Sequence, residues 1–207
     1  PADAAGVRVA GDWDPLGMRA TASRSLELDD VFVPERARLL PEGLYAQAAQ
    51  RFPHMNFTLA STYFGIAQAA YDFSVQYLRA ELPGMVPVKR RMYPTKQVAV
   101  AQMRIRLAQT RALFVQTLRP ARIAPGDDAR ERLYAAHYSV MENAQAISAL
   151  ALRTCGGQAM LKSLPLERLY RDARCGALML PWTAELCLDR LGHECLYARA
   201  EHDEAID

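Results

Sequence analysis

Two adjacent glycines, followed by a run of charged residues, mark the stretch of this chain that is best suited to contact a ligand. Gly156 and Gly157 have no side chains, so their backbone N–H groups can approach a phosphate closely. Helix termination alone would explain one glycine more readily than two. The charges that follow are Glu167, Arg168, Arg171, Asp172 and Arg174. We expect Arg171 and Asp172 to form an ion pair that holds this loop, and the whole stretch predicts a ligand site.

Arg90 is a second candidate for contact with a phosphate. Its guanidinium group is always charged and can bind a diphosphate through two parallel hydrogen bonds. It lies in the short basic run Lys89-Arg90-Arg91. The alternative, that Arg90 belongs to a solvated basic loop, fits the sequence equally well.

His54 and the four cysteines are the remaining groups with chemical potential. His54 precedes a predicted helix and could act as an acid or a base near neutral pH, or it could be a structural histidine bonded to backbone or water. The spacing of Cys155, Cys175, Cys187 and Cys195 fits no common zinc pattern. We therefore expect reduced, packed thiols in a cytoplasmic protein and no metal site.

The composition limits the class of protein. The chain has 207 residues, of which 51% are hydrophobic and 23% charged, and its net charge is +2. These values are ordinary for a globular protein with a sizeable core. The basic residues are scattered, so we expect no nucleic-acid partner. No apolar run approaches the roughly 20 residues that span a bilayer, so we expect no membrane partner.

Two kinds of structural element must position the candidate residues. Val7 and Val9 predict a short strand, and Ser23–Leu28 leads into Val31–Val33 as further strand, which Pro34 ends. Beyond about residue 44 the apolar residues recur at helical spacing. We predict helices near 55–81, 95–118 and 128–155, a shorter piece at 166–175, and a last helix to about 197 that Thr183 caps. Short connections between long helices indicate an antiparallel four-helix bundle, so the fold is mainly α with a short β segment.

The helical periods also predict which faces of two helices are buried. In the first long helix the expected stripe is Leu59, Tyr63, Ile66, Ala70, Phe73 and Tyr77. In the second helix it is Val98, Ala101, Ile105, Ala108, Ala112, Val115 and Leu118.

Several motifs resemble the acyl-CoA dehydrogenase family. The segment PLGMRATASRSLELDDVFVP resembles the end of that family's β domain, and the Gly-Gly … Leu-Glu-Arg-Leu-Tyr-Arg-Asp-Ala-Arg segment resembles its C-terminal helical domain. The resemblance covers nearly the whole chain. It implies a C-terminal fragment, in which residues 1–40 end the β domain and residues 41–207 form the helical bundle.

The resemblance also implies a flavin site between subunits. In the family an Arg-x-x-Phe-Gly motif reaches the flavin of the neighbouring subunit; here Arg90 and Tyr93 match it, while Pro94 replaces the glycine. The family pattern adds Gly156, Gly157 and Thr183 as cofactor-binding residues. It implies FAD, with FMN as the alternative, and a homodimer or homotetramer.

The family's catalytic glutamate has no counterpart at either of its known positions. These positions correspond to Pro181 and Met55, and the usual coenzyme A contacts correspond to Pro53 and Asn56. Glu185 and His54 remain as candidates for the catalytic group. The alternative for Glu185 is a first-turn glutamate that stabilises the start of a helix.

Three functions are compatible with this pattern. The first is a flavin-dependent oxidoreductase of the acyl-CoA dehydrogenase type, with a small-molecule substrate such as an acyl thioester and an electron-transfer partner. The second is a flavin-dependent monooxygenase of the same fold, which uses oxygen and reduced flavin from a reductase partner and needs no α-proton base. The third is a non-catalytic helical scaffold. We expect the fragment alone to be inactive and to bind flavin poorly.

Overall fold

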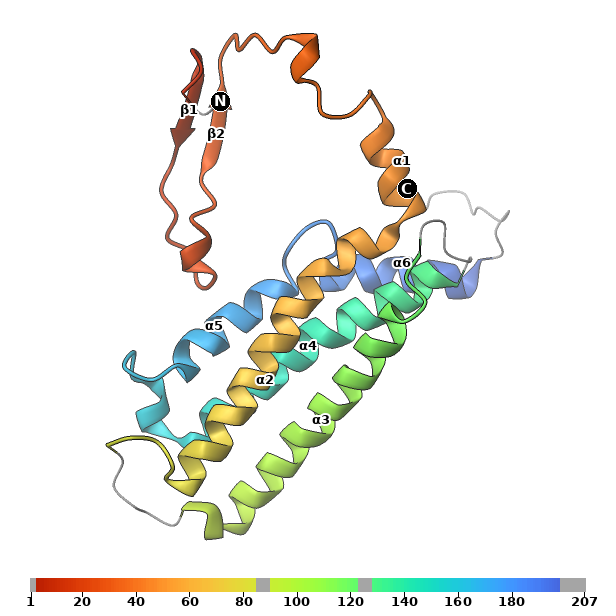
Figure 1. Ribbon diagram of the computed structural model, residues 1–207. Helices are drawn as coiled ribbons and strands as arrows, with labels where there is room; N and C mark the ends of the chain where they lie inside the picture. Colours follow the sequence, from red (N-terminus) through yellow and green to blue (C-terminus); the bar gives the residue numbers. More distant parts are fainter. Residues whose placement is uncertain (1–2, 85–89, 123–127, 198–207) are drawn as a thin grey trace, which may run out of the picture.

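The computed structural model describes residues 3–84, 90–122 and 128–197, and this part of the chain is mainly helical, as predicted (Figure 1). Its helices are α1 (Leu44–Arg51), α2 (Thr58–Arg79), α3 (Pro94–Leu118), α4 (Ala129–Cys155), α5 (Leu166–Gly176) and α6 (Ala184–Leu196). Short 3-10 turns lie between them, among them η3 (Pro53–Phe57), η4 (Arg90–Met92) and η5 (Gly157–Met160). None of the described helices is both long and apolar enough to cross a membrane.

Helix α4 is the central element of the bundle. It packs against α2, α3, α5 and α6. Helices α2 and α3 lie beside it and run antiparallel to each other (Figure 1). Helix α5 packs against both α2 and α4, so it occupies the fourth position of the bundle. Helix α6 lies against α4. The predicted four-helix architecture is therefore confirmed, with α5 rather than the last helix as its fourth member.

Small residues allow these helices to approach one another closely. Alanines on α2 and α4 have no exposed surface, and Gly176 on α5 lies against the ring of Tyr63 and the sulfur of Met141. A Cβ atom at Gly176 would lie 2.5 Å from that sulfur. Ridges of small side chains shorten the distance between helix axes, so the packing of α2, α4 and α5 depends on them. The fully buried alanines on α2 and α4 are Ala60, Ala67, Ala70, Ala136, Ala144 and Ala151.

The predicted burial of α2 is largely confirmed, and that of α3 is wrong. Tyr63, Ala70 and Tyr77 are buried on α2 as expected. On α3, however, Val98 and Ile105 are each 57% exposed, and the predicted stripe faces outward. The inward face carries Ala99, Met103, Leu107 and Thr110 instead. Both faces of α3 contain apolar residues, so periodicity could not decide which of them packs against α2 and α4.

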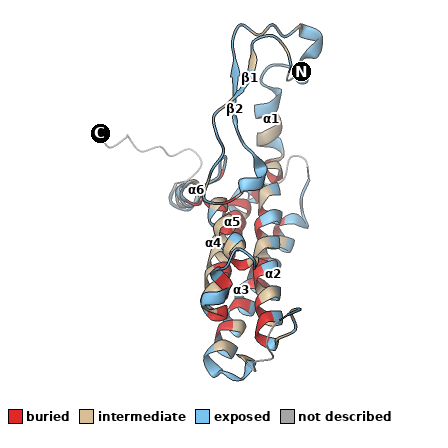
Figure 2. Ribbon diagram, turned by 90° about the vertical axis from the view of Figure 1, so that its left-hand side faces the viewer, coloured by how far each residue is buried: buried red, intermediate tan, exposed pale blue. Residues whose placement is uncertain are grey.

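The N-terminal part forms a two-stranded antiparallel hairpin whose strands lie apart from the bundle (Figures 1 and 2). Strand β1 (Val7–Ala10) pairs with β2 (Ser25–Leu28), with Val7 opposite Leu28. The predicted continuation at Val31–Val33 is wrong, because Asp30 adopts φ 49° and turns the chain away. The hairpin keeps apolar side chains exposed, including Leu28 at 64%. A two-stranded sheet of this kind needs further covering structure to be stable.

Candidate functional site

The structure brings Arg90 and the Gly-Gly pair together at one end of the bundle, which we call the Gly-Gly end (Tyr77, Arg90, Gly156, Gly157 and Gln158). Arg90 opens η4, Gly156 ends α4, and Gly157 opens η5. Tyr77 of α2 connects the two sides. The guanidinium carbon of Arg90 lies 4.9 Å from the centre of the Tyr77 ring, and the Tyr77 hydroxyl donates to Gln158 Oε1 at 3.0 Å.

The Gly-Gly end has a buried donor and an open backbone. Arg90 Nη1 is buried and has no hydrogen-bond partner within the described residues. Buried charged donors nearly always have an acceptor, so an anionic ligand would complete this site. Gly156 has φ 86°, and a Cβ atom on either glycine would meet nothing within 4 Å. The backbone here is therefore accessible to a ligand.

Two neighbouring residues show how this end is built. Lys96 Nζ donates to Thr154 O at 2.5 Å, so a cation caps the last turn of α4 and fixes the start of α3 against it. Tyr93, the other predicted residue of the motif, is the N-cap of α3 and is 56% exposed. Tyr93 therefore points away from the buried cluster and has room for a ligand only at the surface.

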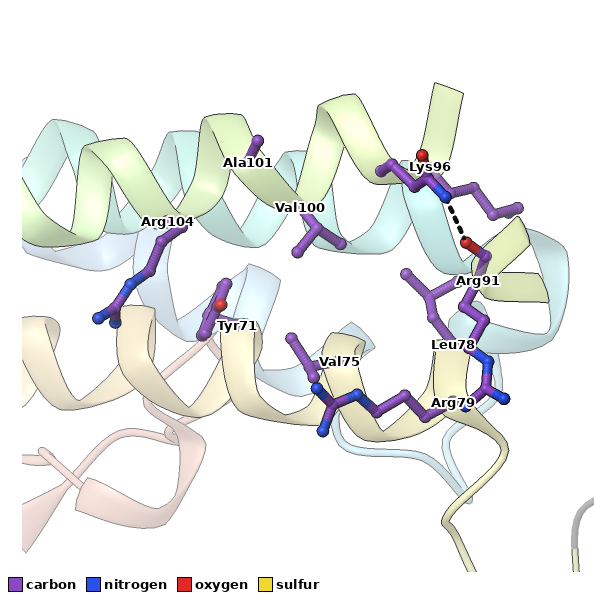
Figure 3. A pocket seen from close by; sticks show the side chains of 10 residues that line it. Tyr71, Val75, Leu78, Arg79, Arg91, Lys96, Val100, Ala101 and Arg104 are labelled. Carbon is purple, nitrogen blue, oxygen red and sulfur yellow. Dashed lines mark hydrogen bonds between the residues drawn. The ribbon is translucent and has the colours of Figure 1, made fainter. Parts of the chain in front are cut away.

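A pocket of about 370 Å³ lies between α2 and α3 near the Gly-Gly end (Figure 3). Its cations are Arg79, Arg91, Lys96 and Arg104, and Val75, Leu78 and Val100 supply apolar surface. Gln97 Nε2 donates to Arg91 O at 3.1 Å and thereby ties η4 to α3 at the pocket edge. None of the lining residues has a carboxylate. Such a pocket fits an anionic molecule with an apolar part.

Thr183 lies at the other end of the bundle, where it begins α6. Thr183 Oγ1 accepts from Leu186 N at 3.2 Å, which confirms the predicted N-cap. The preceding Trp182 is 3% exposed and packs edge-on against Tyr134 and His137 of α4, with ring centres 5.1 and 5.5 Å apart. Tyr134 and Cys155 are 21 positions apart on α4. The two ends are thus separated by about 30 Å.

The two candidate catalytic groups lie on the Thr183 side of the bundle and differ in exposure. Glu185 is exposed on the first turn of α6, where a carboxylate stabilises the helix. His54 is 5% exposed in η3, and burial lowers its pKa more than a backbone hydrogen bond with Thr117 raises it. The family's base positions hold Met55, which is half-buried, and Pro181, which is exposed. No carboxylate therefore occupies a base position.

His137 makes this end of the bundle sensitive to pH. It is 1% exposed, and burial lowers its pKa from 6.5 to about 4, although a backbone hydrogen bond with Trp182 acts in the opposite direction. Between these two values the unfolded chain binds a proton that the folded chain does not. The free energy of unfolding should therefore fall as the pH is lowered from 6.5 towards 4, by up to about 3 kcal/mol from this residue.

Urea denaturation as a function of pH tests this expectation. His137→Gln should flatten the dependence, whereas the same change at the exposed His193 should leave it intact. A residual slope will remain, because the lowered pKa values of His54 and Glu167 act with the same sign. Equal slopes for the wild type and His137→Gln would contradict the assignment.

The charged run after the glycines holds the N-terminal segment against the bundle. Arg171 pairs with Glu167 through bonds of 2.9 and 3.1 Å, and Arg171 Nη1 donates to Leu16 O at 2.8 Å. Asp172 Oδ1 accepts from Met18 N at 2.6 Å. The expected Arg171–Asp172 pair is thus replaced by an Arg171–Glu167 pair, which lowers the pKa of Glu167. The run thus binds Leu16 and Met18 of the N-terminal segment to α5, whereas the expected ion pair was to hold the loop itself.

Gly17 allows this close contact. A Cβ atom there would lie 2.4 Å from Arg171 O, so any larger residue would push the segment off α5. Sequence reasoning missed Gly17, Glu167 and Tyr77 as positioning residues. A glycine beside Met18 is a weak signal, and Tyr77 was assigned to the apolar core, where its ring does lie. In the described ranges, no cluster of His, Cys, Asp and Glu is arranged to hold a metal ion.

Comparison with known proteins places the chain in a structural and sequence context. The family model for the C-terminal domain of acyl-CoA dehydrogenases matches residues 42–180. The short-chain specific acyl-CoA dehydrogenase of Bos taurus mitochondria is 31% identical over 176 residues, which cover 84% of this chain and 42% of that protein. L-evernosamine nitrososynthase from Micromonospora sp. is 30% identical over 216 residues, which cover 97% of this chain and 49% of that protein.

The chain is also similar to a solved structure. KijD3 in complex with FMN and dTDP-3-amino-2,3,6-trideoxy-4-keto-3-methyl-D-glucose superimposes with a TM-score of 0.75 and 27% identity. The match covers 94% of this chain and 49% of that one. The chain thus spans about half the length of the relatives it matches.

Proposed function

The chain belongs to the acyl-CoA dehydrogenase family of flavoproteins, and from this premise we propose that it forms the C-terminal, cofactor-binding and oligomerising part of a flavin-dependent oxidoreductase. The observation that carries the proposal is Arg90 Nη1, which is buried beside the Gly-Gly pair without an acceptor in the described residues. A diphosphate supplies such an acceptor, and the guanidinium fork matches its oxygens. FAD contains a diphosphate and FMN does not, so this end favours FAD.

A flavin at this site would lie between two copies of the protein. The Gly-Gly end and Thr183 are about 30 Å apart along α4, so we assign these two groups of one chain to two different flavins. We assign Arg90, Gly156 and Gly157 to the diphosphate of a flavin held mainly by a second copy. Thr183 is assigned to the flavin of its own copy. Tyr93 would contact the cofactor from the surface of η4 and α3.

The outward face of α3 supports a homodimer or homotetramer. Pockets along both sides of α3 are lined by cations, and none of their lining residues is acidic. Symmetric contact of this face with itself would bring like charges together. A second copy that carries a flavin diphosphate would supply negative charge. The lining cations are Arg79, Arg91, Lys96, Arg104, Arg106, Arg111, Arg119 and Arg153.

We assign the reaction to oxygenation by a reduced flavin. Met55 and Pro181 cannot accept a proton, so abstraction of an α-proton from an acyl thioester has no base at either family position. A reduced flavin supplies the two electrons with which oxygen is split between substrate and water. This reaction requires no carboxylate base. The similarity to a nitrososynthase along 97% of the chain supports the same assignment and makes a nitrogen-bearing sugar nucleotide the first substrate to test.

Acyl-CoA dehydrogenation is the second candidate, since the bovine relative is named for it. It would require Glu185 or His54 to act as the base and an electron-transfer partner to accept the electrons. The exposed position of Glu185 and the lowered pKa of the buried His54 both count against it.

Anaerobic spectroscopy on the full-length protein separates the candidates. If the protein is an oxygenase, butyryl-CoA added without oxygen should leave the absorbance of bound FAD unchanged. In a second assay, with a reductase, NADH and oxygen, the protein should convert a dTDP-linked amino sugar to an oxygenated product. Bleaching of FAD by butyryl-CoA would overturn the assignment and establish the dehydrogenase. A protein that neither contains nor binds FAD or FMN would be the scaffold of the third hypothesis.

A further inference from the structure

We propose that Tyr77 is a positioning residue for the anion site at the Gly-Gly end: its ring orients Arg90, and its hydroxyl orients Gln158. The proposal rests on the proposed flavin-binding function, because it assigns Tyr77 a part in that same site. It adds Tyr77 as the element that prepares the site and Gln158 as a second hydrogen-bond donor to the ligand.

The ring of Tyr77 fixes the plane of Arg90. Arg90 comes from a single 3-10 turn and has a long side chain, so its guanidinium would otherwise sample many orientations. The guanidinium lies 4.9 Å from the ring centre, and Tyr77 is only 2% exposed. A cation over a buried aromatic face is held by the ring quadrupole. Tyr77 therefore determines where the buried Nη1 points.

Within the described residues no carboxylate forms an ion pair with Arg90, and Glu81, which follows α2, pairs with Arg79 at 3.8 Å. At the end of α4 the thiol of Cys155 lies within electrostatic reach of Arg90, and burial raises the pKa of this thiol despite the opposing effects of Ser74, Lys96 and Arg90. The thiol therefore stays protonated and neutral near pH 7. The second cation, Lys96, already donates to Thr154 O. Arg90 is thus the cation left for a ligand within this described cluster.

The hydroxyl of Tyr77 fixes the other side of the site. It donates to Gln158 Oε1 at 3.0 Å, which ties η5 to α2. Because Oε1 accepts this proton, the amide orientation is set and Nε2 remains as a donor. Gln158 follows the two accessible glycines directly and is itself exposed. One buried phenol thus holds a charged donor and a neutral donor on the two sides of the same end of the bundle.

The test compares Tyr77→Phe, Tyr77→Leu, Gln158→Ala and Arg90→Gln in the full-length protein, with FAD as the probe. The dissociation constant is measured over a range of NaCl concentrations, since salt screens a contact with Arg90 and not one with a neutral group. Arg90→Gln should weaken FAD binding about 10- to 100-fold and reduce the salt dependence. Tyr77→Phe keeps the ring, so it should weaken binding about fivefold and leave the salt dependence intact.

Coupling between the residues distinguishes positioning from packing. Tyr77→Leu should reduce the salt dependence to that of Arg90→Gln, and adding Arg90→Gln to it should have little further effect. Tyr77→Phe and Gln158→Ala should likewise be non-additive. If Tyr77→Leu weakens binding with unchanged salt dependence, or if the effects simply add, Tyr77 is only a core residue and the proposal is overturned.

Two further outcomes are separable. If Tyr77→Leu does not fold, the Tyr77→Phe and Gln158→Ala pair still decides, because independent effects on FAD affinity would overturn the role of the hydroxyl. If the wild type does not bind FAD, the proposed function itself fails, and this proposal with it. If the wild type binds FAD but the effects of the substitutions on FAD affinity simply add, only the proposal for Tyr77 is overturned.

Discussion

Replacement of Ile105 by arginine should separate the subunits of the proposed oligomer and release the proposed flavin. Ile105 lies near the middle of α3 and is 57% exposed within the chain. We propose that a second copy covers it. A larger, charged side chain would neither fit that contact nor find a carboxylate nearby, because residues 94–118 contain Lys96, Arg104, Arg106 and Arg111 but no acidic residue. In a twofold-symmetric interface both subunits would contribute the new arginine, so the unfavourable contact would occur twice.

We expect the dissociation constant of the oligomer to rise by at least about 100-fold, as for a buried hot-spot residue. Sedimentation measures the mass, and absorbance of the separated species measures bound flavin. Because Ile105 is exposed within its own chain, the helical domain should keep its own stability to within about 0.5 kcal/mol. The matched control is Leu188→Arg on α6, an apolar residue 49% exposed and away from α3. An Ile105→Arg protein of unchanged mass would refute the interface.

Replacement of Trp182 by alanine should cost the helical domain about 3–5 kcal/mol of unfolding free energy. Trp182 is 3% exposed and contacts Tyr134 and His137 edge-on, a geometry that favours aromatic pairs. The buried residues of α6 itself are only Ala184 and Cys187. Trp182 is therefore the main apolar anchor that holds the start of α6, and Thr183 with it, on α4.

Urea denaturation of Trp182→Ala, Trp182→Phe and Leu180→Ala measures this effect. The phenylalanine variant should lose less, since it keeps an aromatic ring against Tyr134. Leu180 lies two positions away but is 74% exposed, so its truncation should change the unfolding free energy by less than about 0.5 kcal/mol. Equal effects of Trp182→Ala and Leu180→Ala would show that Trp182 is not the anchor.

The positions of the helices could be predicted from the sequence because their signals are local. Pro94 at the start of α3, Gly156 after α4 and Thr183 before α6 act through the backbone of their own turns. The family motifs are local too, and residue type and spacing alone identify Arg90, Gly156 and Gly157 as their members. The absence of a carboxylate at Met55 and Pro181 was equally visible in the sequence.

The inward face of α3 could not be predicted in this way. Periodicity records which residues are apolar, and α3 is apolar both at Val98 and Ile105 and at Met103 and Leu107. The bundle buries the second pair, and the first pair stays exposed in a single chain. In the sequence, apolar residues of the core look the same as apolar residues of a surface that another copy would cover. Only the packing of α3 against α2 and α4 shows which residues belong to the core.

The relation between the candidate site residues was also decided by the tertiary structure. Arg90 and Gly156 are far apart in sequence, and they meet because α2 and α4 end at the same place and Tyr77 reaches both sides. Thr183 follows Gly156 closely in sequence, yet α5 carries the chain back along the bundle to the opposite end. Residue type and spacing determined which groups can bind a flavin. The direction of each helix determined which of those groups share one site.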